Sequence, residues 1–287
     1  MKIGQWKATQ GLNERYNQIR ELGLESNVAE LDAFGFTVVE NAIDQATVDT
    51  LLRRICDVAG DRLGTKVDPI DGSTHAGTTQ MLNGMLLEGP EFERALLHPV
   101  AQTLLAYLLG DSYLLDSLHA FVKGPGAPAL PLHDDTAQVP EPMARYAQVA
   151  NCNWLLTDYT EHGAGAIRFV PGSHRFCRHP RPDEMNDESR MVTVEAPPGS
   201  FVVFHGNTWH GAEPKTSDGL RVNLIYYGCR TYMRPQEFYF DKLPAEVFER
   251  NPPEFARLLG RDLPFTDNSY DVEKTKLLGS VSRAQHL

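Results

Sequence analysis

The sequence has few cysteines, a deficit of positive charge and no long apolar run. Its 287 residues include four cysteines and no CxxC pair. A structural zinc site is therefore not expected, and reduced thiols in a cytoplasmic setting are the default. Lys and Arg number 27 against 38 Asp and Glu, which gives a net charge of −11. This balance argues against nucleic acid or an anionic membrane as the main partner.

Two kinds of targeting segment are also missing from the sequence. No run reaches the roughly 18 apolar residues that a transmembrane helix needs, so no membrane span is expected. The first residues, Met1 to Arg20, are polar and contain no apolar signal core. What remains is the profile of a globular protein, with 41% hydrophobic and 23% charged residues.

Helical and β patterns divide the chain into two parts. The N-terminal part, about 8–110, shows apolar residues at helical spacing, with Asp44 expected to cap one helix. Its expected helices are 8–22, 25–34, 45–60 and 91–109, its strands 36–40 and 80–87, and a long loop covers 61–78. From Tyr113 onward, β-like runs alternate with Gly and Pro turns, at 113–122, 148–156, 166–170, 191–194, 200–204 and 220–227.

Many short strands separated by turns predict a mainly β fold with flanking helices, a sandwich or barrel of the jelly-roll type. The β core is expected at about 113–235, with the N-terminal helices packed on one sheet. No linker rich in Gly, Ser or Pro and no internal repeat divides the sequence. A single domain over residues 1–287 is therefore expected.

Two residues after the first Gly/Pro turn of the β part have the spacing of metal ligands. In Leu132-His133-Asp134-Asp135-Thr136, positions i and i+2 of an extended segment point to the same side. His133 and Asp135 then face the interior, while Asp134 faces away. An HxD pair alone is weak evidence, because a surface turn explains it equally well.

A third ligand is expected near a later glycine turn. His205 and His210 compete there, in the stretch from Phe204 to Gly211. His205 fits a packing or supporting role at a strand end, whereas His210 lies past the turn, where the chain starts back and can aim it inward. Two imidazoles and one carboxylate can occupy one face of an iron octahedron and leave the opposite positions free for substrates.

Arg221 follows in a strand of alternating character. Alternation places Arg221, Asn223, Ile225 and Tyr227 on one face. A buried guanidinium needs an anionic partner, because an unpaired buried charge is very costly. That partner is either an internal carboxylate or the carboxylate of a bound co-substrate, which suits the planar fork of arginine.

Together these motifs resemble the phytanoyl-CoA dioxygenase-like iron(II)/2-oxoglutarate-dependent oxygenases. The resemblance covers about residues 28–235, and the matching stretches are 34–39, 123–126 with 131–135, 154–158 with 170–174, and 209–211 with Ser217 and Arg221. It implies a double-stranded β-helix, cupin-like fold. It also implies iron(II) bound by His133, Asp135 and His210, and 2-oxoglutarate anchored at its far end by Arg221.

The resemblance implies an oxygenase that uses O2 and 2-oxoglutarate to oxidise a C–H bond. Hydroxylation is the default outcome, with desaturation, epoxidation and ring closure as alternatives. Asp135 occupies the position that halide takes in related halogenases, which disfavours halogenation. Related enzymes often carry glutamine three positions before the first histidine, where this sequence has Leu130. Contacts to 2-oxoglutarate are therefore expected from other residues, with Asn151, Asn153, Thr157 and Ser217 as candidates.

The substrate is expected to be a small, mostly apolar molecule such as a natural-product intermediate. Its walls would come from the loop 61–86, the segment 137–148 and the aromatic run 232–240, with Met81, Asn83, Met85 and Tyr232 as candidate contacts. Two other classes remain open: a metal-dependent hydrolase or isomerase on a cupin-like barrel, since zinc accepts the same ligands, and a non-catalytic ligand-binding barrel. A monomer or homodimer in the cytoplasm is expected.

Overall fold

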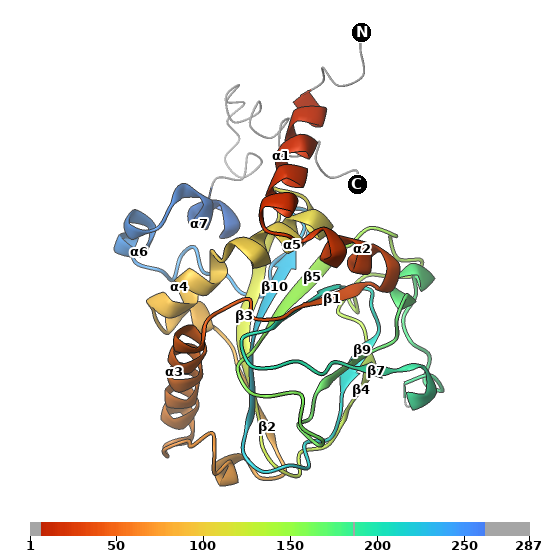
Figure 1. Cartoon of the computed structure of the whole chain (residues 1–287). Coiled ribbons are helices and arrows are strands. Elements are labelled where there is room, and N and C mark those ends of the chain that lie inside the picture. Colours follow the sequence, from red (N-terminus) through yellow and green to blue (C-terminus); the bar gives the residue numbers. More distant parts are fainter. Residues whose placement is uncertain (1–6, 186, 262–287) are drawn as a thin grey trace.

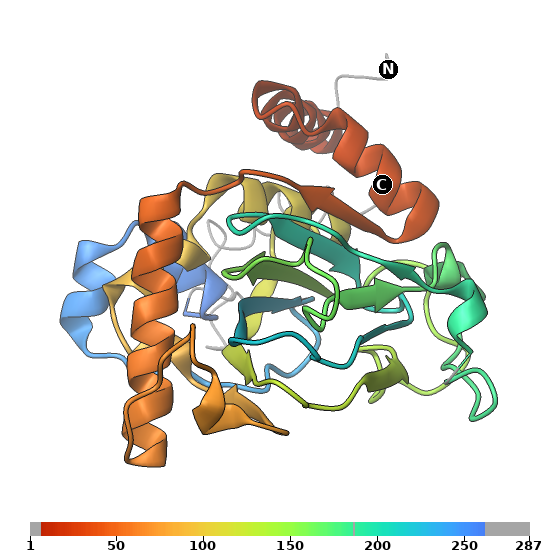
Figure 2. The same cartoon turned by 60° about the horizontal axis from the view of Figure 1, so that its bottom comes forward.

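The computed structural model describes residues 7–185 and 187–261, which form two antiparallel β-sheets with helices on one side (Figure 1). The larger sheet has the strand order β1-β8-β5-β10-β3-β2, and the smaller sheet has the order β4-β9-β6-β7. The strands are β1 Phe36–Val39, β2 Thr79–Leu82, β3 Leu114–Lys123, β4 Leu130–His133, β5 Val149–Leu155, β6 Ile167–Phe169, β7 Val192–Thr193, β8 Phe201–His205, β9 His210–Ala212 and β10 Arg221–Cys229. Figure 2 shows the two sheets facing each other.

The helices lie mainly before the β core. They are α1 Lys7–Glu21, α2 Glu25–Phe34, α3 Gln45–Leu63, α4 Pro90–Leu96, α5 Pro99–Leu109, α6 Ala245–Arg250 and α7 Pro253–Leu258. Short 3-10 turns occur at Ser73–His75, Met85–Leu87, Ser173–Phe176 and Glu188–Arg190. Within the described part of the chain, no helix is both long and apolar enough to cross a membrane.

Strand alternation divides the side chains of the larger sheet between two environments. Its outer face carries Trp154, Phe201 and Leu224, which pack with α3 and α5 in the main hydrophobic core. Its inner face turns toward the smaller sheet and carries polar residues, among them Asn151 and Arg221. The helices therefore stabilise one face, and the space between the sheets is left for a polar site.

Two expectations about local structure were wrong, for identifiable reasons. The expected helix 91–109 is two helices, because Pro99 lacks a backbone N–H and disfavours helical geometry at His98. The expected strand 80–87 ends at Leu82, because Gly84 adopts a positive φ of 74° and starts a 3-10 turn. By contrast, Asp44 caps α3 as expected, since its carboxylate accepts the Thr47 N–H at 2.9 Å.

Strands β1 and β2 lie in the N-terminal part, yet both belong to the larger sheet. β1 pairs with β8, and β2 pairs with β3. The N-terminal part therefore contributes an edge strand at each side of the sheet that carries the site.

Candidate metal centre

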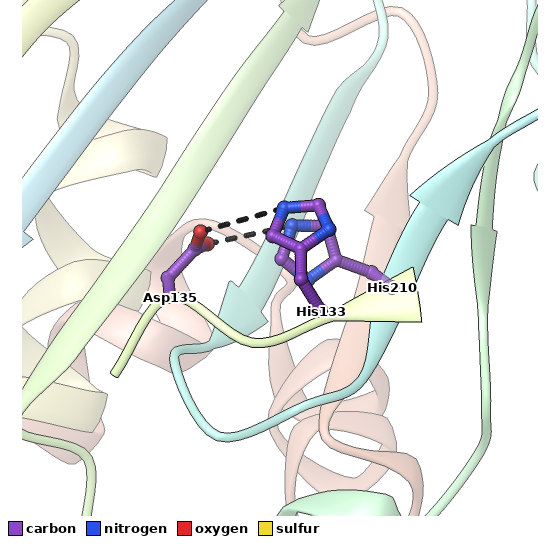
Figure 3. Close-up of side chains that lie close together, drawn as sticks. All are labelled: His133, Asp135 and His210. Atoms are coloured by element: carbon purple, nitrogen blue, oxygen red, sulfur yellow. Dashed lines mark ion pairs between the residues drawn. The ribbon is translucent and has the colours of Figure 1, made fainter. Parts of the chain in front are cut away.

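His133 and His210 are brought together by the pairing of β4 with β9. In this antiparallel pair His133 lies directly opposite His210, and the ring centroids are 4.2 Å apart (Figure 3). Gly211 makes the close approach possible, because a Cβ at this position would collide with the carbonyl oxygen of Leu130. The His210 ring also packs against Phe204, with the centroids 4.7 Å apart, which fixes its direction.

Asp135 reaches the same point from the loop after β4. Its backbone N–H donates to the Gly206 carbonyl at 2.9 Å, and its own carbonyl accepts the Tyr227 hydroxyl at 2.5 Å. The carboxylate oxygens lie 3.9 Å from Nε2 of His133 and 3.5 Å from Nε2 of His210. One ligand atom from each of the three residues lies within 4.8 Å of the others, a spacing that one metal ion can bridge.

Backbone carbonyls set the tautomer of both histidines. Nδ1 of His133 lies 3.0 Å from the Pro131 carbonyl, and Nδ1 of His210 lies 3.0 Å from the Thr208 carbonyl. A carbonyl only accepts hydrogen bonds, so each Nδ1 carries the hydrogen and each Nε2 presents a lone pair toward Asp135. Neutral imidazoles oriented in this way are the state that binds a metal ion.

Burial shifts the pKa values of His210 and Asp135 so that the neutral form of each is favoured. It lowers the pKa of His210 to about 3, assisted by the neighbouring His133, so the ring is neutral near pH 7. Burial raises the pKa of Asp135 to about 6, against the opposing effects of His133 and of the Asn151 amide, which donates to the carboxylate. Among the described residues, no Lys or Arg forms an ion pair with Asp135. A cation bound at this point would therefore compensate the negative charge of its carboxylate.

A cavity of about 300 Å³ extends from these donors between the sheets. Besides the three donors, its walls include Met81, His119, Phe121, Leu130, Gln138, Asn151, Asn153, Ile167, Phe204, Arg221, Asn223, Ile225, Tyr227 and Gln236. Three polar atoms of these walls are buried without a hydrogen-bond partner: Nε of Arg221 and Oδ1 of Asn151 and Asn153. Buried polar groups are normally paired, so these atoms fit a pocket for a small polar ligand.

Arg221 stands at the start of β10 and is 8% exposed. Its guanidinium donates to the Tyr159 hydroxyl at 3.2 Å and to Oδ1 of Asn223 at 3.0 Å. No carboxylate forms an ion pair with it among residues 7–185 and 187–261. The internal ion pair that the sequence left open is therefore not found in the described structure.

A second cation stands beside Arg221. Lys123 is its register partner on β3, is 2% exposed, and donates from Nζ to the Glu213 carbonyl at 2.6 Å. Burial, then the positive charges of Arg221 and Arg168, lower the pKa of Lys123 to about 8. Two basic side chains, Arg221 on the cavity wall and Lys123 beside it, therefore lie together at this end, an arrangement that favours an anionic ligand.

The expected co-substrate residues fall into two groups. Asn151 and Asn153 line the cavity. Thr157 and Ser217 lie outside its walls: the Thr157 hydroxyl accepts the Val222 N–H at 3.0 Å, and the Ser217 hydroxyl donates to the Gly163 carbonyl at 3.2 Å. Thr157 thus fixes the backbone directly after Arg221.

The expected substrate residues are likewise divided. Met81 lines the cavity. Met85 is fully buried in the main hydrophobic core, and Asn83 and Tyr232 are exposed away from the cavity walls. His205 also points elsewhere: its Nδ1 accepts the Asn207 N–H at 3.0 Å, and its Nε2 lies 3.3 Å from the Arg145 carbonyl.

His119 and Phe121 are cavity residues that the sequence reasoning missed. The signal was present, because alternation along the expected strand 113–122 puts both on one face. Nδ1 of His119 lies 3.2 Å from the Ser117 hydroxyl, and burial lowers the pKa of its ring to about 4. His119 therefore offers the cavity a neutral imidazole.

Comparison with known proteins now gives the family. A family model described as phytanoyl-CoA dioxygenase (PhyH) matches residues 31–223. The chain belongs to the phytanoyl-CoA dioxygenase family. Dioxygenase af480 of Aspergillus fumigatus, a curated relative, is 33% identical over 191 residues, which are 62% of this chain and 60% of that protein.

Solved structures share the fold of this dioxygenase-family chain. HygX from Streptomyces hygroscopicus, with nickel and 2-oxoglutarate bound, aligns with a TM-score of 0.61 and 15% identity over 74% of this chain and 89% of HygX. SnoK, a non-heme alpha-ketoglutarate-dependent carbocyclase from nogalamycin biosynthesis, aligns with a TM-score of 0.58 and 21% identity over 77% and 90%. The predicted jelly-roll fold is thus confirmed. So is the predicted dioxygenase class, since the family model and the curated relative are both described as dioxygenases.

Proposed function

We propose that His133, Asp135 and His210 hold iron(II) and that Arg221 binds the far carboxylate of 2-oxoglutarate. One observation carries this assignment. Arg221 is buried without a carboxylate partner in the described residues, and it lines the same cavity as the three donors. An unpaired buried guanidinium is costly, and a co-substrate carboxylate would supply the missing charge in a bidentate geometry.

The residues around the metal donors prepare them for the ion. The Pro131 and Thr208 carbonyls keep hydrogen on Nδ1 of the two histidines and leave each Nε2 free to bind. The Asn151 amide holds one oxygen of Asp135, and Tyr227 fixes the Asp135 backbone. An iron(II) ion held by these residues would supply the activation of O2 that couples to the decarboxylation of 2-oxoglutarate to succinate and carbon dioxide.

The residues around Arg221 hold its guanidinium ready for an anion. Oδ1 of Asn223 and the Tyr159 hydroxyl fix one terminal nitrogen, and Nε stays unpaired. Lys123 adds a second positive charge beside it. A dianionic keto acid between the metal and Arg221 would meet opposite charge at both ends. This is why we favour 2-oxoglutarate over a neutral ligand.

We further propose that the substrate is a small, mostly apolar molecule, such as a natural-product intermediate, oxidised at a C–H bond. Met81, Phe121 and Leu130 offer apolar wall, and His119 offers a hydrogen bond. Leu130 replaces the glutamine of related enzymes with an apolar surface. Hydroxylation is the primary proposal. Ring closure is the second, because SnoK is described as a carbocyclase.

Two alternatives lead to different measurements. A hydrolase or isomerase on this barrel would need the metal donors but no Arg221, and a non-catalytic barrel would need neither. We expect the purified chain with iron(II), 2-oxoglutarate and air to form succinate faster when its substrate is present. A screen of compound classes for such stimulated release tests this. Succinate release that no compound class stimulates, together with metal-dependent hydrolysis or isomerisation, would favour the alternative.

The remaining expectations belong to the same proposal. We propose a single domain over 1–287, since β1 and β2 of the N-terminal part pair directly with β8 and β3 of the core. We also propose a monomer or homodimer in the cytoplasm, with a small molecule as partner and no role for nucleic acid or membrane.

A further inference from the structure

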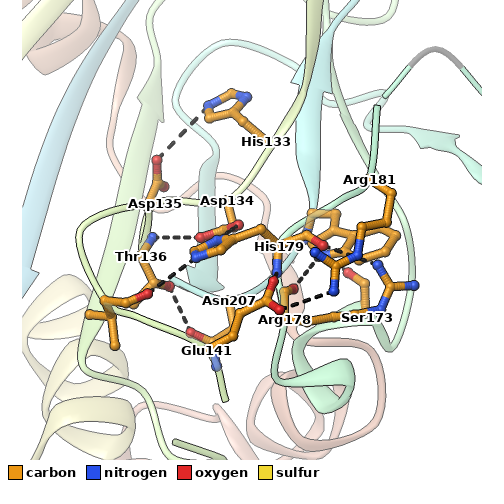
Figure 4. A network of polar contacts seen from close by, with 12 residues as sticks. His133, Asp134, Asp135, Thr136, Glu141, Ser173, Arg178, His179, Arg181 and Asn207 are labelled. Atoms are coloured by element: carbon orange, nitrogen blue, oxygen red, sulfur yellow. Dashed lines mark hydrogen bonds and ion pairs between the residues drawn. The ribbon is translucent and has the colours of Figure 1, made fainter. Parts of the chain in front are cut away.

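The segment 178–184, called the clasp below, contacts both stretches of chain that carry the metal donors (Figure 4). One stretch contains His133 and Asp135 with Asp134 between them, and the other ends at His210. Within the described residues, the hydrogen bonds of the clasp reach the residues next to the donors and not the donors themselves.

The first contact is made by His179. Its Nδ1 lies 2.7 Å from Oδ2 of Asp134, which is 4% exposed. Oδ1 of the same carboxylate accepts the Thr136 N–H at 2.9 Å. Nε2 of His179 lies 3.1 Å from the Val139 carbonyl. The carboxylate that alternation turns away from the metal is thus held on its far side, which restricts rotation of the donor-bearing backbone.

The second contact is made by the neighbouring residue, Arg178. Its carbonyl accepts the indole N–H of Trp209 at 3.0 Å, and its guanidinium carbon lies 4.7 Å from the Trp209 ring. A double hydrogen bond to Glu184, at 2.7 and 2.8 Å, holds this guanidinium within the clasp. Trp209 immediately precedes His210, so two consecutive residues secure both donor stretches.

Other bonds tie the same parts together. The Thr136 hydroxyl donates to Oδ1 of Asn207 at 2.7 Å, which links the two donor stretches directly. The backbone N–H of His179 and the Arg181 guanidinium both donate to the Glu141 carboxylate, at 2.8 and 3.0 Å. The His179–Asp134 pair is less exposed than the Arg181–Glu141 pair, because the Asp134 carboxylate is buried.

We propose that His179 is a positioning residue for the metal centre, which holds the His133–Asp135 stretch through Asp134 while Arg178 holds Trp209 beside His210. This role rests on the proposed function, because it needs the three donors to bind a metal. Groups that orient metal ligands typically change metal affinity about 10- to 100-fold when they are removed.

The test compares Co(II) binding, followed by its visible d–d absorption, in the unaltered chain and three variants. His179→Leu removes the bond to Asp134 and should raise the dissociation constant for Co(II) by about 10- to 100-fold and change the band shape. His179→Asn should restore both, since the asparagine Nδ2 takes the place of the histidine Nδ1. Arg181→Ala is the matched control. It breaks the more exposed ion pair of the same segment and should leave affinity and band shape unchanged.

The outcomes separate this role from the proposed function. Equal Co(II) affinity and spectra for His179→Leu and the unaltered chain would overturn the positioning role alone, as would failure of His179→Asn to restore what His179→Leu loses. Absence of metal binding by the unaltered chain would overturn both proposals. If His179→Leu does not fold because it leaves the Asp134 charge unpaired, the double variant Asp134→Asn, His179→Leu removes that charge, and the same weakening is expected.

Discussion

Replacing Arg221 by methionine tests the co-substrate assignment in two independent ways. The change removes the charge and the donors but keeps an unbranched side chain of similar reach. In the structure Arg221 is buried, donates to two neutral oxygens and has no carboxylate partner in the described residues. Arg221→Met should therefore change the affinity for 2-oxoglutarate much more than it changes the free energy of unfolding.

The expected size of each effect follows from this environment. Two hydrogen bonds between a guanidinium and a carboxylate contribute about 1.5–3 kcal/mol each. In Arg221→Met, the charge of Lys123 would still supply part of this binding energy. A loss of about 3 kcal/mol, or about 100-fold in the dissociation constant for 2-oxoglutarate, is expected. The free energy of unfolding without ligand should change by only about 1 kcal/mol, because relief of the unpaired charge offsets the two lost hydrogen bonds.

Anaerobic titration calorimetry of 2-oxoglutarate into the Fe(II)-loaded protein measures the first effect, and denaturant unfolding of the metal-free protein measures the second. Arg168→Met is the control, since Arg168 is also buried but pairs with Glu188 at 2.9 Å and does not line the cavity. It should leave 2-oxoglutarate affinity unchanged. Unaltered affinity in Arg221→Met, with a loss of about 3–5 kcal/mol in stability, would show that Arg221 belongs to a structural ion pair and would refute the reasoning.

Four further substitutions test the metal donors and their surroundings. His210→Ala should abolish iron(II) binding, while His205→Ala, whose ring faces away from the donors, should largely spare it; the reverse result in equilibrium dialysis would reassign the ligand. Tyr227→Phe removes the hydroxyl that donates to the Asp135 carbonyl, and should weaken Fe(II) binding by about 10-fold, measured by anaerobic competition with a chelator. Gly211→Ala forces a Cβ against the backbone of β4, and should cost about 1–3 kcal/mol of stability in denaturant unfolding; an unchanged midpoint would show that the β4–β9 approach is not tight.

Local patterns in the sequence predicted much of the site, because strand alternation depends only on neighbouring residues. Alternation selected Asp135, whose carboxylate lies beside the two histidines, over Asp134, whose carboxylate bonds to His179, although Asp135 lies in the turn after β4 rather than on the strand. It also put Arg221 and Asn223 on one face of β10, and both line the cavity. The same rule applied to the strand 113–122 would have identified His119 and Phe121.

These local patterns could not predict contacts between segments that are distant in the sequence. Nothing local indicates that Val222 would occupy the Thr157 hydroxyl, or that Met85 would turn into the core after Gly84. The bond between His179 and Asp134 joins residues 45 positions apart, and no local pattern in the sequence connects them. Such pairings depend on how strands register across the barrel, which hydrophobic periodicity does not specify.

The central claim is that one iron(II) ion at His133, Asp135 and His210 shares a cavity with 2-oxoglutarate held by Arg221. Anaerobic addition of iron(II) and then 2-oxoglutarate, followed by visible absorption, tests it most directly. We predict a weak metal-to-ligand charge-transfer band in the unaltered chain, no band in His210→Ala, and a band that needs about 100-fold more 2-oxoglutarate in Arg221→Met. Absence of the band in the unaltered chain, or a band unaffected by both substitutions, would contradict the claim.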